Sequence, residues 1–312
     1  ADIEASSSLC RNWSPGVPGD CVPRLASTLD RTNPYGESRR LVREILCTGK
    51  SFAYHLRVYM GPDERVLPPR SVLVVMPAYN AARTLAQTWQ AIPADVVHEV
   101  LLVDDHSIDA TVDVATLLAI RTLALPHNVG YGGNQKACYL EALRLGADVV
   151  VMLHPDGQYD PKMIPRMVQP ILEGEADLVL GSRMLVPGAA RRGKMPLYRF
   201  VANKALTWME NRVMGTSFSE LHTGYRVYSR RFLQTVPFLR NSNDFVFDTE
   251  ILAQAVVFHQ RVMEVPIETR YNADASSTSM SANIRYGLGT IRVMARLVLH
   301  RDHLFSSRLF TP

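Results

Sequence analysis

The chain has 312 residues, 47% of them hydrophobic, which is enough to bury a core in one large domain or two small ones. Its net charge of +4 suits anionic ligands such as nucleotides and phosphates, but the basic residues lack the dense clustering of a nucleic-acid-binding protein. No run reaches the roughly 20 apolar residues of a membrane span, and residues 1–30 do not read as a signal peptide. The four cysteines lack C-x-x-C spacing, which favours a reduced cytoplasmic chain that is free or peripheral on the inner membrane face.

The N-terminal part of the chain is irregular. Residues 1–35 are rich in Ser, Pro and Gly and predict an arm. Residues 37–47 carry apolar side chains at helical spacing, and residues 51–60 fit a short strand. Pro68-Pro69 then marks a boundary, so we expect residues 1–70 to form an extension of unknown role.

From residue 71 onward, apolar strand-like runs alternate with helical segments. The strand-like runs cover residues 71–76, 99–103, 121–125, 148–153 and 177–180, with shorter ones at 225–228 and 262–265. The helical segments cover residues 81–91, 109–119, 133–145, 161–173, 197–214, 247–259 and 283–300. This order predicts an α/β fold with a mainly parallel sheet covered by helices on both faces. We divide it into halves at 71–180 and 181–300, followed by a tail at 301–312.

Polar clusters follow four successive strands. They are Pro77-Ala78-Tyr79-Asn80, Asp104-Asp105-His106-Ser107, Asn128 to Gly133, and His154 to Asp160. In a parallel sheet the carboxyl ends of the strands meet at one edge, where ligands bind. The sequence therefore predicts a composite ligand site at this edge.

The fourth cluster is the candidate metal site. Asp156 is the best ligand for a divalent cation, with Gln158 and His154 as partners, whereas Asp160 is better suited to cap the following helix. An imidazole ligand favours Mn²⁺ over Mg²⁺. A polar turn without a metal is the alternative.

The second and third clusters suit a nucleotide. We expect Asp104 and Asp105 to contact the base or ribose, because adjacent carboxylates repel each other unless a partner lies between them. Asp109 is predicted to cap the next helix. The glycines of 130–133 do not match G-x-G-x-x-G, so they favour tight packing of loop against helix beside a nucleotide.

Several charged residues in the second half are candidates for the chemistry. Arg183, Arg199 and Arg226 suit phosphate contacts, because a guanidinium grips phosphate with two hydrogen bonds, but each could also be an ordinary surface arginine. Glu220 and His222 could act as a base or be structural.

The last helix has a basic side. Arg285, Arg292 and Arg296 fall within about 40° of one another on a helical projection. An adjoining face carries Ile284, Leu288, Ile291, Ala295 and Val298. Two interpretations stay open: packing of the apolar face in the core, or contact with an anionic membrane surface or a phosphate.

Six of these motifs, in this order, resemble family 2 glycosyltransferases, and most of all the dolichyl- and polyprenyl-phosphate mannosyl- or glucosyltransferases. The motifs are Pro77-Ala78-Tyr79-Asn80, Val103-Asp104-Asp105-His106-Ser107, His127-Asn128-Val129-Gly130, Asp156-Gly157-Gln158-Tyr159-Asp160-Pro161, Gly181-Ser182-Arg183 and Thr223-Gly224-Tyr225-Arg226. The resemblance covers about residues 71–298. It implies a Rossmann-like GT-A fold, a nucleotide-sugar donor such as a UDP- or GDP-hexose, a divalent cation (Mn²⁺ or Mg²⁺) and inversion at the anomeric carbon.

The resemblance also implies roles for individual residues. The donor would be held by Pro77, Ala78, Tyr79, Asp104, Asp105, Asn128 and Gly130. The acceptor phosphate would be held by Arg183, Arg199, Asn203 and Arg226, and the catalytic residues would be Asp156, Glu220 and His222. This chain departs from the family pattern at His154, where D-x-D begins with an acid, and at Ala81, where an acid usually follows the Tyr-Asn pair.

The nature of the acceptor decides whether a base is needed. A phosphate monoester is already an anionic nucleophile, so transfer to a lipid-linked phosphate at a membrane surface needs no strong base. Transfer to the hydroxyl of a soluble small molecule or glycan would need one, with Glu220 or His222 first in line. A non-catalytic nucleotide-binding protein is a third hypothesis, and a homo-oligomer is left open.

Overall fold

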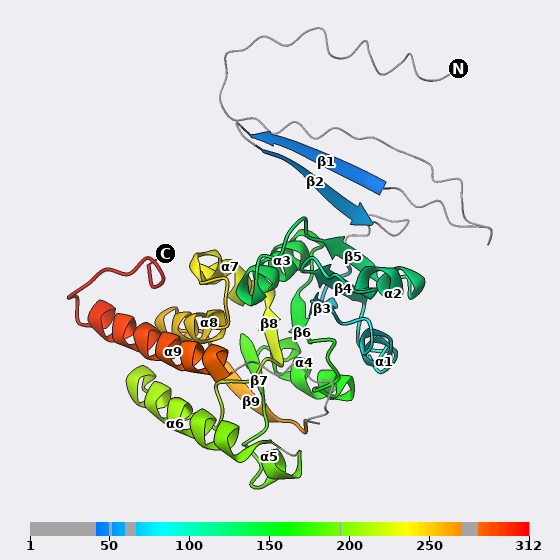
Figure 1. The fold of residues 1–312 in the computed structure, drawn as a ribbon. Coiled ribbons are helices and arrows are strands. Elements are labelled where there is room, and N and C mark those ends of the chain that lie inside the picture. The colour runs from blue at the N-terminus through cyan, green and yellow to red at the C-terminus, as the bar shows by residue number, and fades with distance from the viewer. Residues whose placement is uncertain (1–41, 50–51, 60–66, 194, 270–279, 312) are drawn as a thin grey trace, which may run out of the picture.

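The computed structural model describes residues 42–49, 52–59, 67–193, 195–269 and 280–311. Within these residues the chain builds one sheet with the strand order β1-β2-β5-β4-β3-β6-β8-β7-β9 (Figure 1). The strands are β1 (Val42–Gly49), β2 (Phe52–Tyr59), β3 (Val72–Ala78), β4 (Glu99–Asp104), β5 (Arg121–Ala124), β6 (Val149–Met152), β7 (Leu178–Ser182), β8 (Arg226–Ser229) and β9 (Val262–Pro266).

The sheet is mixed. Strands β5, β4, β3 and β6 run parallel, and β7 runs parallel to β9. Strand β8 lies antiparallel between β6 and β7, and the β1–β2 hairpin pairs antiparallel with β5. The predicted α/β class is confirmed, and its parallel part is the central block. Because β8 is reversed, the residues that precede it lie at the edge where β6 and β7 end.

Helices cover both faces of the sheet. They are α1 (Leu85–Gln90), α2 (Thr111–Leu117), α3 (Tyr131–Arg144), η1 (Pro161–Met163), α4 (Ile164–Leu172), α5 (Ala189–Arg192), α6 (Leu197–Met214), α7 (Arg230–Thr235), η2 (Phe238–Arg240), α8 (Phe247–Val257) and α9 (Met280–Arg301). One core lies under α1, α2 and α4, and the other under α3, α7, α8 and α9. Alternate residues of β3 point to opposite cores: Val72 and Val74 to the first, Leu73 and Val75 to the second.

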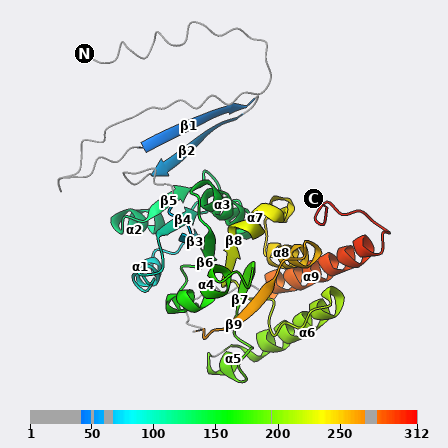
Figure 2. The ribbon, with the colours of Figure 1, turned by 180° about the vertical axis from the view of Figure 1, so that it is seen from behind.

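Helices α6 and α9 form an outer layer. Helix α9 packs against both α8 and α6, and the two views of the ribbon show it between them (Figures 1 and 2). Helix α6 ends at Gly215, whose left-handed backbone (φ 73°) stops the helix at no steric cost. This layer supplies part of the site described below.

The described strands and helices after residue 71 follow the predicted order, with the short helices α5 and α7 in addition. The helix predicted at 37–47 is wrong where it can be checked, because β1 occupies Val42–Gly49 and pairs with β2 along its whole length. The strand predicted at 51–60 is confirmed as β2. The arm predicted at 1–35 lies outside the described residues. The tail packs back onto the domain, with Leu309 and Phe310 buried in the second core.

Candidate active site

The ends of β3, β4 and β5 are held together by Asp105. Its backbone N–H donates to Ala78 O (2.8 Å), and its carboxylate accepts from Val129 N (2.7 Å) and Gly130 N (3.1 Å). Asn128 Nδ2 donates to Asp105 O (3.1 Å). Burial raises the pKa of Asp105, although these backbone N–H groups oppose the shift. Asp105 therefore organises the predicted donor site from within.

The turns after β3 and β4 are also cross-linked. Asn80 N donates to Ser107 Oγ (2.8 Å), and Asn80 Oδ1 accepts from Ile108 N (2.9 Å). Asp104 is buried, and its carboxylate accepts from the Ser107 backbone N–H (2.9 Å) and hydroxyl (2.5 Å). Asn80 and His106 both adopt positive φ (54° and 62°), a conformation that concentrates at functional sites.

The donor-site residues differ in exposure. Pro77 and Ala78 lie buried in β3, and Tyr79 directly after them is 55% exposed. An exposed ring beside buried strand ends can stack on a base. Asp109 was predicted to cap the next helix, and its carboxylate accepts from Thr111 N (3.0 Å) in the first turn of α2, while Ala110 takes the N-cap position.

The glycine-rich turn serves packing. A Cβ on Gly130 would lie 2.6 Å from Asn243 O, and one on Gly132 would lie 2.5 Å from Ser242 O. Gly132 N donates to Asn243 O (2.9 Å), so the loop before α8 closes over the start of α3. The predicted tight packing of this turn is confirmed, and the close partner is the 242–244 loop.

The turn after β6 carries the candidate metal ligand. Asp156 Oδ1 accepts from Gln158 N (3.0 Å), and Thr84 Oγ1 donates to Pro155 O (2.5 Å). The His154 ring is partly buried and stacks on Tyr131, with their centroids 5.5 Å apart. Asp160 caps the following turn, as predicted, by accepting from Lys162 N (3.0 Å).

A cavity of about 440 Å³ opens beside this turn. Its polar lining includes Tyr131, His154, Asp156, Gln158, Arg183, Arg199, Asn203, His222, Asp248 and Tyr286. Its apolar lining includes Met195, Leu206, Phe245 and Ile284. A second cavity of about 620 Å³ shares Gln158 and Tyr159 but contains neither Asp156 nor the predicted phosphate ligands. The smaller cavity is therefore the candidate active site.

Arg183, Glu220 and Asn203 form one cluster on the wall of this cavity. Glu220 is fully buried and forms an ion pair with Arg183. It accepts from Arg183 Nε (2.8 Å), Arg183 N (2.7 Å) and Asn203 Nδ2 (2.8 Å). Burial raises the pKa of Glu220, but the Arg183 charge and these hydrogen bonds outweigh it, so the pKa lies below its ordinary value. A carboxylate held this way is a poor base, which argues against the catalytic role predicted for Glu220. Its contacts favour a role in positioning Arg183 instead.

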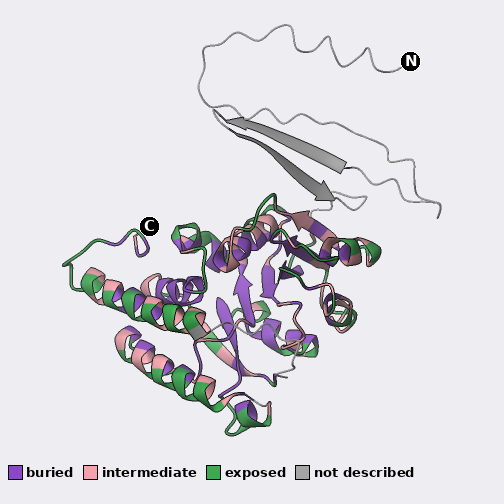
Figure 3. Ribbon diagram, in the orientation of Figure 1, coloured by how far each residue is buried: buried purple, intermediate pink, exposed green. Residues whose placement is uncertain are grey.

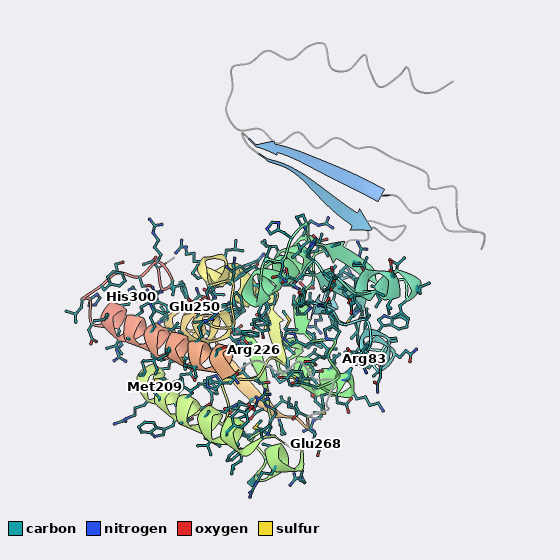
Figure 4. The ribbon with its side chains drawn as sticks, in the orientation of Figure 1. Arg83, Met209, Arg226, Glu250, Glu268 and His300 are labelled. Carbon is teal, nitrogen blue, oxygen red and sulfur yellow. The ribbon has the colours of Figure 1, made fainter. Side chains whose placement is uncertain are left out.

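Arg226 differs from the other predicted phosphate ligands. It is 1% exposed and lies in the middle of the fold (Figure 4). Its guanidinium donates to Thr223 O (2.8 Å), Asp248 O (3.1 Å) and Leu221 O (3.2 Å) and pairs with the Asp248 carboxylate (3.3 Å). Arg226 is not among the residues that line this cavity, and its contacts favour a structural role; the phosphate contact stays a prediction. Arg199, in contrast, lines the cavity from α6.

His222 lines the cavity; its Nδ1 forms a hydrogen bond, whereas its Nε2 lies close to a carboxylate without hydrogen-bond geometry. Its Nδ1 lies 2.6 Å from Tyr286 Oη on α9, and its Nε2 lies 2.9 Å from a carboxylate oxygen of Glu210 on α6. Glu210 is fully buried. Thr249 Oγ1 on α8 donates to Glu210 (3.3 Å). His222 therefore contacts α6 and α9 at the cavity wall, and Glu210 links α6 to α8.

Four further residues in or beside the cavity were not predicted from the sequence: Tyr131, Glu210, Asp248 and Tyr286. Tyr131 Oη donates to Asp248 Oδ2 (2.9 Å), and burial with the Asp248 charge raises the pKa of Tyr131 well above its ordinary value, which keeps this proton in place. A signal for Asp248 was present. It lies with Glu250 in the first turn of an otherwise apolar helix, and buried acids on such a helix need partners.

Asp156 fits a divalent cation. Burial raises the pKa of Asp156, although the neighbouring His154 opposes the shift, and no ion pair forms at Asp156 within the described ranges. The described residues hold no group of three His, Cys, Asp or Glu side chains that could bind a metal alone. A cation here would take Asp156, with Gln158 beside it, and complete its shell with substrate oxygens, as Mg²⁺ does in nucleotide sites. Burial lowers the pKa of His154, which keeps its ring neutral, and its role as a ligand stays a prediction.

Comparison with known proteins agrees with this geometry. Residues 73–236 match the model of the family described as Glycosyl transferase family 2. The chain is 30% identical over 227 residues to the undecaprenyl-phosphate mannosyltransferase of Micrococcus luteus. This match covers 68% of this chain and 88% of that protein. It is 25% identical over 245 residues to the UDP-N-acetylglucosamine–dolichyl-phosphate N-acetylglucosaminyltransferase of Methanococcus voltae. That match covers 73% of this chain and 95% of that protein.

Solved structures share the fold. Glucosyl-3-phosphoglycerate synthase from Mycobacterium tuberculosis, in complex with Mn²⁺, UDP-glucose and phosphoglyceric acid, matches with a TM-score of 0.57 at 18% identity. The match covers 73% of this chain and 80% of that chain. The GT-A fold expected from the motifs is thereby confirmed.

Proposed function

Because the chain belongs to glycosyl transferase family 2, we propose that it transfers a hexose, with inversion, from a nucleoside-diphosphate sugar to a polyprenyl or dolichyl phosphate. Two relatives are named for transfer to such lipid phosphates, which supports this acceptor class. The donor nucleotide would lie over the ends of β3 and β4, with Tyr79 against the base. The enzyme would act as a peripheral protein on the inner membrane face.

One observation carries the choice of acceptor: both candidate bases are already engaged within the protein. Glu220 binds Arg183 and Asn203, and its pKa is lowered. His222 contacts Glu210 and Tyr286. A hydroxyl acceptor needs a base within hydrogen-bonding reach, whereas a phosphate monoester is already deprotonated. The cavity that contains Asp156 also contains Arg183 and Arg199, which suit an anionic acceptor.

The reaction then needs orientation and charge stabilisation. An oxygen of the acceptor phosphate attacks the anomeric carbon while the bond to the nucleoside diphosphate breaks. Arg199 and the Arg183–Asn203 cluster orient the acceptor phosphate, and Asp156 would hold a divalent cation. A divalent cation bound there would offset the negative charge that develops on the leaving diphosphate.

The test compares two acceptors with the same hydrocarbon chain. We expect hexose transfer from a UDP- or GDP-hexose to a short-chain polyprenyl phosphate and none to the corresponding polyprenol. Asp156→Asn should lower kcat by about 100-fold or more, since it removes a charge that acts on the transition state. Its melting temperature without ligands should not fall. Equal transfer to the alcohol, or full activity of Asp156→Asn, would contradict the proposal.

A further inference from the structure

Helix α6 turns apolar side chains outward. Its buried residues are Asn203, Thr207, Glu210 and Met214, which is a polar set for an inner face. Its exposed side chains include Leu197, Tyr198, Val201 and Trp208, and Trp208 is 70% exposed. Spacings of four and seven residues place Leu197, Val201 and Trp208 along one stripe. Hydrophobic packing within the described residues does not account for this stripe.

Helix α9 also exposes apolar side chains, although its buried face is itself mostly apolar. Thr290, Val293, Met294 and Leu297 are buried. The exposed side includes Ile284, Leu288, Ile291 and Leu299, with Leu288 63% exposed. The apolar face of this helix, for which core packing was one of the two interpretations of the sequence, therefore lies largely on the surface. Figure 3 shows exposed positions along the outer sides of both helices.

The charges on this surface are positive. Helix α9 has no acidic residue and carries Arg285, Arg292 and Arg296 beside the apolar stripe. Among the ion pairs of the described residues, none involves these three arginines. The exposed side of α6 adds Lys204 and Arg212, and its one acid, Glu210, is fully buried. Apolar stripes with an exposed Trp and basic flanks are typical of helices that lie in a membrane interface.

The candidate active site opens at this surface. Tyr198, Ala202 and Leu206 of α6 line the cavity, and so do Ala282, Ile284 and Tyr286 of α9. Tyr198 and Ile284 belong to both the cavity wall and the exposed apolar surface. A ligand with an anionic head and a hydrocarbon tail could therefore place its head at Arg199 while its tail stays against the α6 and α9 stripes.

We propose that the exposed faces of α6 and α9 form a docking surface for an anionic lipid bilayer, which sets the mouth of the active site against the headgroups. This inference rests on the proposed function, since it supplies the route by which a lipid-linked phosphate reaches the cavity. A bilayer explains the basic and the apolar residues together. A second copy of the chain in a symmetric dimer would bring the arginines of one α9 toward those of the other, with no exposed acid on either helix to offset them.

Vesicle co-sedimentation of the whole chain tests the proposal. We expect binding to vesicles of phosphatidylcholine with 30% phosphatidylglycerol (about this share gives a strongly anionic surface) and weak binding to phosphatidylcholine alone. Trp208→Ser with Leu288→Ser should lower the affinity at least 10-fold, since both remove buried apolar area from the interface. Arg292→Ser with Arg296→Ser should lower it about 30-fold, at about fivefold per arginine.

Matched controls come from exposed residues elsewhere. Leu117→Ser on α2, where Leu117 is 85% exposed, and Arg231→Ser on α7 should bind vesicles as the wild type does. All variants should keep the wild-type melting temperature. Wild-type indifference to anionic vesicles would overturn the proposal, as would docking variants that bind like the wild type. A wild-type dimer in solution that Trp208→Ser dissociates would also overturn it.

Activity separates this inference from the proposed function. The docking variants should keep wild-type transfer to a short, water-soluble polyprenyl phosphate and lose at least 10-fold with a long-chain acceptor in vesicles. Absence of transfer to either acceptor, with vesicle binding retained and sensitive to the variants, would refute the proposed function and leave the docking surface standing.

Discussion

The buried Arg183–Glu220 pair allows a prediction with a defined magnitude. Glu220→Gln keeps the shape of the side chain and removes its charge, so the Arg183 guanidinium loses its counter-charge inside the protein. Glu220 now accepts three hydrogen bonds besides the ion pair, from Arg183 Nε, Arg183 N and Asn203 Nδ2. Removing one partner of a buried pair costs about 3–5 kcal/mol. At about 2 °C per kcal/mol for a chain of this size, we expect the melting temperature to fall by about 6–10 °C at pH 7.

The stability difference between the wild type and Glu220→Gln should depend on pH. The pKa of Glu220 is lower in the folded than in the unfolded chain, so its stabilisation is complete above the unfolded value of about 4.3. It is lost as the pH falls through the folded pKa, because the folded carboxylate is then protonated as well. Glu220→Gln cannot titrate, so its free energy of unfolding should approach that of the wild type as the pH falls.

Thermal melts at pH 7 and chemical denaturation across pH, each with the exposed Glu175→Gln as control, measure the two effects. The reasoning would be refuted by a Glu220→Gln protein that melts within about 2 °C of the wild type at pH 7, a difference of about 1 kcal/mol or less. It would equally be refuted by a well-folded variant that loses all transfer to phosphate acceptors with an unchanged KM, because that is the behaviour of a lost base.

Two further pairs of variants give contrasting outcomes. In α9, Gly287 has open space around it, so Gly287→Ala should raise the free energy of unfolding by about 0.5–1 kcal/mol. The Cβ of Gly289→Ala would collide with Val246, so this variant should lower the free energy of unfolding by about 1–3 kcal/mol. Thermal melts compare the two variants. Arg226→Gln should lower the free energy of unfolding by about 3–5 kcal/mol because it removes the cationic partner of Asp248. Arg199→Gln should keep the wild-type melting temperature and raise KM for the acceptor, and the opposite pattern would restore Arg226 as a phosphate ligand.

The order of elements was predictable because strands and helices differ in period. The run Val72 to Ala78 is apolar on both faces, which suits a strand buried between two helical layers. Helix α6 was predicted with its observed bounds, since Pro196 precedes it and Gly215 ends it. Residues 37–47 were assigned to a helix because their apolar side chains fall at helical spacing, but so short a run fits a strand as well, and pairing with β2 decides the outcome.

The site was predictable only where local sequence determines the geometry. Asp156 and Asp105 follow strands, so the topology alone brings them to the edge of the sheet. The distinction between Arg199 and Arg226 depends on which arginine has an internal acid, and Asp248 is 22 residues away from Arg226 in the sequence. Glu210, His222 and Tyr286 meet only because α6 and α9 pack side by side. No local pattern encodes such a contact.

The reversed direction of β8 has a consequence for how acceptor preference can change. Residues 183–220 leave the sheet after β7 and return before β8 at the same edge, where Arg183 N donates to Glu220 Oε2 (2.7 Å). The two ends of this excursion are thus joined by a hydrogen bond. The loops that flank helix α6 can vary in length at a small entropic cost, since loop closure scales only with the logarithm of length. A change of acceptor therefore need not disturb the part of the sheet that holds the donor.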